Sequence, residues 1–306
     1  MTTEAIYAAV DWGTTSFRLW LIGADGTPLA ERRAGEGMTT AAQEGFSAVL
    51  ERHLAALDAP AHLPVMICGM AGARQGWMDA GYLDVPARLD AIVGRAVTVP
   101  DPNRDIRILP GLAQRLEAAP DVMRGEETQL LGAAGDLGPG SHLLCMPGTH
   151  SKWVRLRDGA VEGFSTFMTG ELFDVIGKQS ILRHAIEGAG PFDGSHPAFL
   201  DAVKTACIAS ARFSNLVFSL RSGQLLHGLD ATSAKARLSG LLIGLEIAGA
   251  RDTAPDALHV QLIASGAMAA LYTAALEAAT LGATVIDADQ AVRRGLHAAA
   301  SAVWPS

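Results

Sequence analysis

The chain has 306 residues, with 24 lysines and arginines against 32 aspartates and glutamates and a formal net charge of −8. This acidic balance argues against a general affinity for nucleic acid or for an anionic membrane, and it favours small molecules as ligands. The length is sufficient for two hydrophobic cores, so we expect two lobes that face a cleft. The three cysteines lack the spacing of a zinc site or a disulfide framework, and we expect reduced core thiols.

Neither end of the chain nor its helices suggest a membrane protein. The N-terminus leads directly into an apolar strand without a basic start, and the most apolar segment, 238–250, is short and contains Glu246. A spanning helix needs roughly 20 apolar residues. We therefore expect a cytoplasmic protein. The apolar helix at 239–250 fits either a homodimer interface or, as is more common, the core.

The first half mixes short strands with helices. In chain order, we predict strands at 6–10, 17–22 and through 31, a helix at 41–57, strands at 65–68 and 106–109, and a helix at 126–134. A Gly-Pro-Gly break at 138–140 marks the boundary to the second half. The mixture indicates an α/β lobe over residues 1–135.

The second half begins as the first does, with strand, glycine turn, strand and an Asp-Gly hairpin in the same order. The predicted elements are strands at 143–146 and 153–156, helices at 172–186, 198–210 and 234–250, a strand at 258–264 and helices at 265–281 and 289–303. We expect a second lobe over 141–288, with 289–306 packing back on the first.

The turn after the first strand has the composition of a phosphate-binding turn. Small residues let backbone N–H groups approach phosphate oxygens, hydroxyl groups donate further hydrogen bonds, and an arginine neutralises negative charge. The candidate phosphate-binding residues here are Gly13, Thr14, Thr15, Ser16 and Arg18. Asp11, just before them, can orient a hydrated cation. An ordinary hairpin is the alternative interpretation of this turn.

A similar turn follows the first strand of the second half. Its candidate phosphate-binding residues are Gly148, Thr149, His150, Ser151 and Lys152. Met146 occupies the position of Asp11, so only the first turn offers a carboxylate to a cation. Lys152 either contacts phosphate or lies in solvent, and His150 either donates to phosphate or packs as a neutral ring. A third turn, Ser265, Gly266 and Ala267, follows a strand and opens a helix, which places N–H groups at a ligand-facing end.

These three turns, in this order, resemble the first phosphate, second phosphate and adenosine motifs of the actin and hexokinase ATPase superfamily. Within it, the segments 122–132, 146–154, 168–172 and 239–244 resemble the 2-dehydro-3-deoxygalactonokinase family. The resemblance implies a two-lobed actin-like ATPase fold, ribonuclease H-like and duplicated, with a central nucleotide cleft. It also implies ATP and Mg²⁺ as cofactors, with Asp11 toward the metal, and phosphorylation of the 6-hydroxyl of 2-dehydro-3-deoxy-D-galactonate.

A kinase needs a group that receives the proton of the attacking hydroxyl. Related sugar kinases place an Asp after Gly at a helix start shortly before the second phosphate motif, and Gly125-Glu126-Glu127 occupies the matching place here. The resemblance therefore implies Glu126 as the catalytic base, with Glu127 as the alternative. Both could instead be first-turn acids that the helix dipole favours.

A keto sugar acid also brings a carboxylate, for which arginine is the natural partner. Arg74 and Arg124 are the candidates, although exposed arginines are commonly only solubilising. Glu171 resembles a residue that accepts a hydrogen bond from a sugar hydroxyl, and Trp77 either walls the substrate pocket or belongs to the core. Two other functions remain open: a kinase for another sugar or sugar acid, and an actin-like ATPase module without kinase activity.

Overall fold

The computed structural model describes residues 4–305, which form two compact units. The first unit comprises the chain up to Gly140, the segment Arg157–Gly163 and the chain from Ala288 onward. The second unit comprises Ser141–Leu156 and Phe164–Asp287. Across residues 4–305, every helix is too short or too polar to cross a membrane.

The first unit is built on a mixed sheet with the strand order β3-β2-β1-β4-β8-β7. Its strands are β1 (Ala5–Trp12), β2 (Phe17–Gly23), β3 (Pro28–Ala34), β4 (Val65–Gly69), β7 (Val97–Val99) and β8 (Ile106–Ile108). β1, β2 and β3 pair antiparallel, whereas β4 and β8 continue the sheet in parallel from β1. β1 and β2 have an almost continuously buried apolar pattern, so the sheet has helices on both faces.

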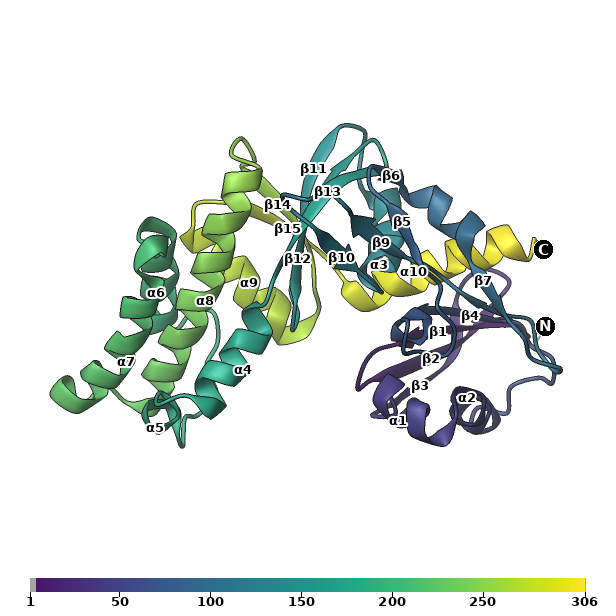
Figure 1. Ribbon diagram of the computed structural model, residues 1–306, viewed down its shortest axis with the longest axis horizontal. Helices are drawn as coiled ribbons and strands as arrows, with labels where there is room; N and C mark the ends of the chain where they lie inside the picture. Colours follow the sequence, from purple (N-terminus) through teal and green to yellow (C-terminus); the bar gives the residue numbers. More distant parts are fainter. Residues whose placement is uncertain (1–3, 306) are drawn as a thin grey trace. The chain divides into compact units, whose positions relative to one another are not determined.

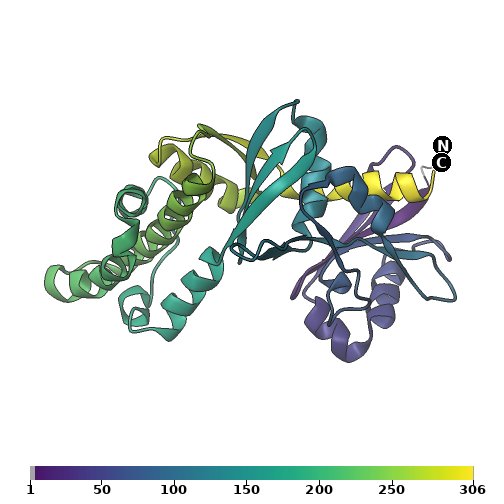
Figure 2. The ribbon, with the colours of Figure 1, turned by 45° about the horizontal axis from the view of Figure 1, so that its top comes forward.

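Helices α1 (Met38–Glu44) and α2 (Phe46–Ala55) cover one face of this sheet, and α10 (Ala288–Val303) lies on the other (Figures 1 and 2). The predicted single helix over 41–57 is therefore wrong. The chain breaks at Gly45, whose φ of 95° is a left-handed conformation outside the helical region. Phe46 and Leu50 on α2 pack with Trp12 and Phe17 in the core of the unit.

Smaller elements complete the first unit. They are β5 (Tyr82–Asp84), β6 (Ala87–Arg88), β9 (Gly111–Gln114), β10 (Asp121–Met123), α3 (Glu126–Ala133) and the short 3₁₀ turns Met70–Gly72, Leu89–Arg95 and Ala134–Asp136. β10, β9 and β5 form a sheet of their own. α10 packs along α3, so the C-terminal helix is part of this unit.

The sheet of the second unit has the order β15-β14-β11-β12-β13. Its strands are β11 (Ser141–Met146), β12 (Ser151–Arg157), β13 (Ala160–Phe167), β14 (His259–Ile263) and β15 (Gly282–Ile286). Three strands consecutive in the sequence come first, and β14 and β15 then continue in parallel from β11. The topology of the first sheet is repeated, as the matching turns of the sequence indicate.

Helices fill the rest of the second unit. They are α4 (Thr169–Gln179), α5 (Arg183–Ile186), α6 (Pro197–Ile208), α7 (Phe213–His227), α8 (Ala231–Thr253), α9 (Gly266–Ala278) and the 3₁₀ turn Ser210–Arg212. The predicted helix 172–186 is two helices, because the backbone is extended at Ser180. α6, α7 and α8 lie side by side (Figure 1). Leu241, Leu242 and Ile243 of α8 are buried within this unit, so the segment 239–250 is core.

Candidate functional site

The first turn connects β1 to β2 and presents hydroxyl side chains to solvent. The backbone N–H of Gly13 donates to the carbonyl of Ser16 at 2.8 Å, which closes the turn. The side chains of Thr14, Thr15 and Ser16 are exposed. The turn therefore offers three hydroxyl groups on a fixed backbone, an arrangement suited to phosphate oxygens.

The segment before α1 supports this turn from behind. A Cβ atom on Gly37 would lie 2.5 Å from the carbonyl oxygen of Thr14 and 2.5 Å from the backbone nitrogen of Thr15, so only glycine fits there. The N–H of Met38 donates to the carbonyl of Gly13 at 2.9 Å. The turn is thus held by packing and by backbone hydrogen bonds.

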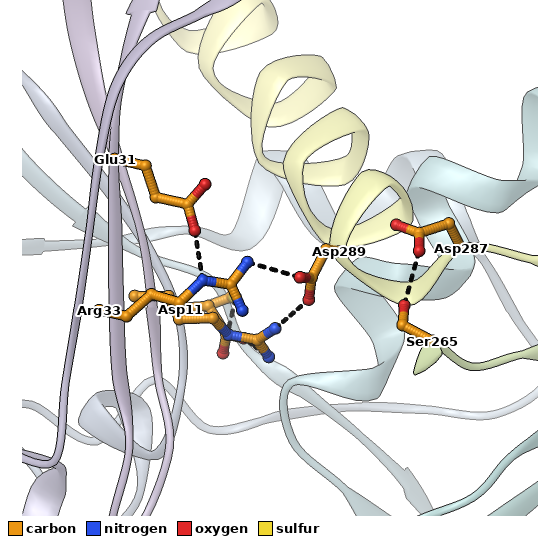
Figure 3. Close-up of polar contacts among 8 residues, drawn as sticks. Asp11, Glu31, Arg33, Ser265, Asp287 and Asp289 are labelled. Carbon is orange, nitrogen blue, oxygen red and sulfur yellow. Dashed lines mark hydrogen bonds and ion pairs between the residues drawn. The ribbon is translucent and has the colours of Figure 1, made fainter. Parts of the chain in front are cut away.

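An alternating row of charges lies beside the first turn (Figure 3). Arg18 Nη2 is 2.6 Å from Asp11 Oδ2, and its Nη1 contacts Asp289 at the start of α10. Arg33 Nη2 is 2.6 Å from the other oxygen of Asp289, and Arg33 also contacts Glu31. Burial raises the pKa of Asp11, and the charge of Arg18 opposes that rise. Arg18, predicted to face phosphate, is here paired with two carboxylates.

The two candidate bases at the start of α3 have different surroundings. The Glu127 side chain is fully buried, and its carboxylate accepts the N–H of Gly125 at 2.7 Å and the hydroxyl of Thr128 at 3.1 Å. Burial, together with the charge of Glu126, raises the pKa of Glu127 to about 8. Glu126 is half-buried, and one of its oxygens accepts the N–H of Arg124 at 3.1 Å. Of the two, Glu126 is the carboxylate that solvent reaches.

The end of β4 connects Asp11 to the start of α3. Asp11 pairs with Cys68 in the parallel β1–β4 register, and the Cys68 thiol lies 3.8 Å from Asp11 Oδ1. The next residue, Gly69, packs closely on Gly125. A Cβ atom added to Gly125 would lie 3.5 Å from the Cα of Gly69. Strand pairing therefore brings the candidate metal ligand and the candidate base to one end of the first sheet.

The two candidate arginines also differ. Arg74 is exposed. Arg124 is half-buried, its guanidinium lies 4.4 Å from the centre of the Tyr82 ring, and its Nη2 donates to the carbonyl of Gly81 at 2.9 Å. Within residues 4–305, Nε and Nη1 of Arg124 are buried and have no hydrogen-bond partner. A buried donor without a partner is unfavourable, so Arg124 has capacity for an anionic ligand.

Trp77 belongs at least partly to the core. Its ring stacks on Phe46 with 5.8 Å between centroids and meets Trp12 edge to face at 6.1 Å. It remains half-buried rather than buried. The ring therefore has a structural role, and its exposed part is the portion that a ligand could touch.

The second turn connects β11 to β12 in the second unit. Gly148, Thr149 and His150 are exposed, whereas Ser151 is buried and its hydroxyl accepts the N–H of Gly148 at 3.4 Å. Lys152 is also buried, and its ammonium donates to the carbonyl of His150 at 3.2 Å. Lys152 therefore does not lie in solvent, contrary to one of the two alternatives that the sequence left open.

The start of α4 supports the second turn much as the segment before α1 supports the first. A Cβ atom on Gly170 would lie 2.5 Å from the carbonyl oxygen of Gly148. The N–H of Glu171 donates to the carbonyl of Thr149 at 3.0 Å, and the Glu171 carboxylate contacts His150 Nε2. The structure thus brings together His150 and Glu171, which the sequence analysis assigned to different ligands.

The third turn lies where β14 enters α9. Gly266 has a φ of 59°, and Gly266 and Ala267 are exposed at the N-terminus of the helix. The Ser265 hydroxyl donates to Asp287 Oδ2 at 2.7 Å (Figure 3). The exposed N-terminus of α9 is a suitable position for polar groups of a ligand.

A cavity of about 210 Å³ lies within the second unit, between the second turn and α9. Its lining residues are Gly148, Thr169, Gly170, Phe173, Phe192, Lys235, Ser239, Leu242, Ile243, Met268, Leu271 and Tyr272. Sequence reasoning did not assign most of them, because they come from three helices (α4, α8 and α9), the second turn and the loop that holds Phe192. The signals were the segments 168–172 and 239–244, which carried part of the family resemblance and contain five of the lining residues.

Two units with one repeated sheet topology, each with a glycine turn after its first strand, define the actin-like ATPase fold. Component A of (R)-2-hydroxyglutaryl-CoA dehydratase from Acidaminococcus fermentans shares the fold, with a TM-score of 0.50 and 13% identity over 97% of this chain and 99% of that one. The chain belongs to the 2-keto-3-deoxy-galactonokinase family, whose model matches residues 11–299.

Individual relatives match along the whole chain. A protein of Rhizobium meliloti (strain 1021), described as a candidate 2-dehydro-3-deoxygalactonokinase, is 63% identical over all of both chains. The 2-dehydro-3-deoxygalactonokinase of Escherichia coli (strain K12) is 36% identical over 98% of this chain and 99% of its own. A crystal structure from Sinorhizobium meliloti, also described as a candidate 2-dehydro-3-deoxygalactonokinase, has a TM-score of 0.96 and 63% identity, covering 98% of this chain and 100% of that one.

Proposed function

We propose that this protein is an ATP-dependent kinase that phosphorylates the 6-hydroxyl of 2-dehydro-3-deoxy-D-galactonate and releases ADP, a step of galactonate catabolism. The observation that carries this proposal is the family match over residues 11–299. The 36% identity to the Escherichia coli kinase over nearly both full lengths supports it.

In this proposal, Glu126 is the general base. Its carboxylate takes the proton of the sugar hydroxyl as the hydroxyl oxygen bonds to the γ-phosphorus and the bond from that phosphorus to the bridging oxygen of ADP breaks. The half-buried position of Glu126 supports this assignment over Glu127, whose carboxylate is enclosed and already bonded to Gly125 and Thr128.

The phosphate groups are assigned to the two turns. The hydroxyl groups of Thr14, Thr15 and Ser16 are exposed on a turn whose backbone is fixed by Gly37 and Met38. The exposed backbone of Gly148 and Thr149 is fixed in the same way by the start of α4. Fixed donors stabilise developing negative charge without reorganisation during the reaction.

Mg²⁺ is assigned to Asp11. Among residues 4–305, no group of three or more histidine, cysteine, aspartate or glutamate side chains could hold a metal ion. A single carboxylate is nevertheless sufficient for Mg²⁺, which keeps its waters and binds mainly to nucleotide phosphates. When bound, the ion would neutralise charge on those phosphates. Arg18, 2.6 Å away, favours the ionised form of Asp11 that the ion requires.

The nucleoside is assigned to the second unit. The cavity of about 210 Å³ has mainly apolar walls with a few polar groups, which suits a flat aromatic base. Gly148 lines this cavity and also belongs to the second turn, so a base in the cavity would have its phosphates at that turn. Ser265, Gly266 and Ala267, which resemble an adenosine motif, are assigned to the nucleoside.

The sugar acid is assigned to Arg124, with Arg74, Trp77 and Glu171 as further candidates. The two unpartnered nitrogens of Arg124, Nε and Nη1, are each available to donate to a carboxylate oxygen. Its contacts with Tyr82 and Gly81 hold the guanidinium in place before the substrate arrives. Preorganisation of this kind lowers the entropy that binding loses.

One measurement tests both reaction and substrate: ADP formation with 2-dehydro-3-deoxygalactonate beside its gluconate epimer. The proposal expects ADP release that depends on the sugar acid, and faster turnover of the galactonate compound. Faster turnover of the epimer would indicate a kinase for another sugar acid. A rate of ATP hydrolysis that stays the same with and without either sugar acid would indicate an ATPase module without kinase activity.

A cytoplasmic location is part of the proposal, because ATP is the phosphate donor. The homodimer expected from 239–250 gains no support from that segment, since its apolar side chains are buried within the unit. Cell fractionation and light scattering test the two points separately.

A further inference from the structure

Glu246 is a buried carboxylate that the proposed chemistry does not use. It lies in the middle of α8 with 1% of its surface exposed, in a helix segment that is otherwise apolar. A buried carboxylate needs several hydrogen bonds, since its desolvation is costly. The groups around Glu246 come from β11, β12, α4 and α9, so the carboxylate lies where these elements meet.

Two donors have well-defined geometry. Trp153 Nε1 on β12 donates to Glu246 Oε1 at 2.8 Å, and the Tyr272 hydroxyl on α9 donates to Oε2 at 2.9 Å. Hydroxyl groups of Thr169 and Ser151 also bond to the carboxylate, and these bonds oppose the rise in its pKa that burial causes. The Cys145 thiol on β11 also lies 4.0 Å from Oε1, and all five of these side chains are neutral.

The contacts continue from Glu246 to the second turn. The Ser151 hydroxyl lies 3.1 Å from the Tyr272 hydroxyl, and its single proton is donated either to the Tyr272 oxygen or directly to Glu246. The Ser151 oxygen in turn accepts the N–H of Gly148 at 3.4 Å. In both arrangements the carboxylate is the final acceptor, and the Ser151 oxygen remains the acceptor for the N–H of Gly148.

Thr169 adds a second route to the same turn. It is the first residue of α4, and the next two residues of that helix contact the turn. Gly170 packs on Gly148, and the N–H of Glu171 donates to the carbonyl of Thr149 at 3.0 Å. Glu246 thus reaches the turn through Tyr272 and Ser151 on one side and through Thr169 on the other.

We propose that Glu246 is a positioning residue that holds the second turn in its phosphate-binding shape. The inference rests on the proposed function, because it takes that turn as a phosphate site. Glu246 touches no substrate in this proposal. It acts through Ser151, Tyr272 and Thr169. Since Tyr272 and Thr169 also line the nucleoside cavity, the loss of Glu246 should weaken ligands with phosphate groups more than the nucleoside alone.

The test compares the affinities of ADP and adenosine, measured by calorimetry, in Glu246→Gln. Glutamine has the same shape but has one acceptor oxygen and an NH₂ donor, which would face either Trp153 Nε1–H or the Tyr272 hydroxyl. We expect ADP binding to weaken about tenfold, as for the loss of a buried hydrogen bond, and adenosine binding to weaken clearly less. Equal weakening of both ligands, or unchanged ADP binding in a folded variant, would overturn the inference.

Tyr272→Phe provides a second route to the same answer if Glu246→Gln fails to fold. It keeps the ring that lines the cavity and removes only the hydroxyl group, so the same selective loss of ADP affinity is expected. In the double variant, the two losses should not add, because both interrupt one series of hydrogen bonds. Additive losses would contradict the inference.

The matched control is Glu277→Gln, an exposed glutamate on α9 that should leave both affinities unchanged. The wild-type protein distinguishes the two levels of the argument. If it binds no ADP, the proposed function itself fails. If it binds ADP and turns over the sugar acid while Glu246→Gln retains full ADP affinity, only the positioning role of Glu246 fails.

Discussion

Asp11 and Arg18 face each other in the β1–β2 hairpin, with Arg18 Nη2 2.6 Å from the Asp11 carboxylate. The sequence placed Arg18 against phosphate, but its guanidinium is shared between Asp11 and Asp289. Burial raises the pKa of Asp11, and Arg18 provides the largest opposing effect. We infer that Arg18 acts chiefly by keeping Asp11 ionised.

The first prediction concerns Arg18→Gln. Without the guanidinium, the pKa of Asp11 rises further, so a higher pH is needed to ionise it for Mg²⁺. The acid limb of the pH profile of kcat/KM should move to higher pH. The matched control is Arg33→Gln, which removes a contact of Asp289 but none of Asp11, and its acid limb should stay in place. A higher KM for ATP at every pH, without movement of the limb, would instead show that Arg18 binds phosphate.

The second prediction is that Glu126→Gln lowers kcat by roughly 10²–10⁴-fold, the usual contribution of a general base. ADP affinity should remain close to wild type, because the carboxylate acts on the sugar hydroxyl. Steady-state turnover and calorimetry measure the two quantities. Glu117→Gln, on an exposed part of the same unit, is the control and should keep full activity. Normal turnover by Glu126→Gln would eliminate this residue as the base.

The third prediction concerns stability and Glu127. Its pKa is about 8 in the folded protein and 4.5 for an ordinary glutamate, so the folded state holds the proton more tightly. The contribution of Glu127 to the free energy of unfolding should therefore be greatest below pH 4.5. It should decrease as the pH rises to about 8. The difference between these values corresponds to about 5 kcal/mol as an order of magnitude.

Glu127→Gln removes this titration while its amide keeps an acceptor for the N–H of Gly125. Denaturant unfolding at several pH values between 5 and 8 should show a clearly flatter pH dependence for the variant than for the wild type. Glu117→Gln again serves as the control, with a wild-type slope. Parallel curves for Glu127→Gln and wild type would show that Glu127 does not titrate in this range.

The repeated strands and turns could be predicted from the sequence because their signals are local. Each glycine turn has an apolar strand on either side and an Asp-Gly hairpin after the second strand, and the structure has β1, β2, β11 and β12 at those places. Helix limits were less accurate. The helical spacing of apolar residues continues past Gly45, although the helix ends there. Helix α7 was missed because its apolar positions are interspersed with serine, asparagine and glycine.

The site was less predictable, because burial depends on residues far away in the sequence. Nothing near Glu126 and Glu127 shows which of them the fold encloses. The burial of Lys152 and the contact of His150 with Glu171 likewise arise only when β12 and α4 come together. Glu246 was noticed only as a charge in an apolar helix, since its partners lie on four other elements.

The last prediction separates the two candidate arginines. Arg124 has two buried nitrogens without partners in residues 4–305, whereas Arg74 is exposed. If Arg124 binds the carboxylate of the sugar acid, Arg124→Lys should raise the KM for that substrate by roughly tenfold or more, because lysine lacks the two-pronged geometry. The KM for ATP should change little, since ATP makes no contact with Arg124 in the proposed arrangement.

Arg115→Ala is the control for general charge effects, because Arg115 is exposed in the same unit and pairs only with Asp84 among the described residues, at 2.6 Å. Arg74→Ala completes the comparison. A rise in the sugar-acid KM for Arg74→Ala, with Arg124→Lys unaffected, would transfer the assignment to Arg74. The unpartnered nitrogens of Arg124 would then have to be explained by the packing against Tyr82 alone. A rise confined to Arg124→Lys means that the fold prepares a carboxylate site before the substrate binds.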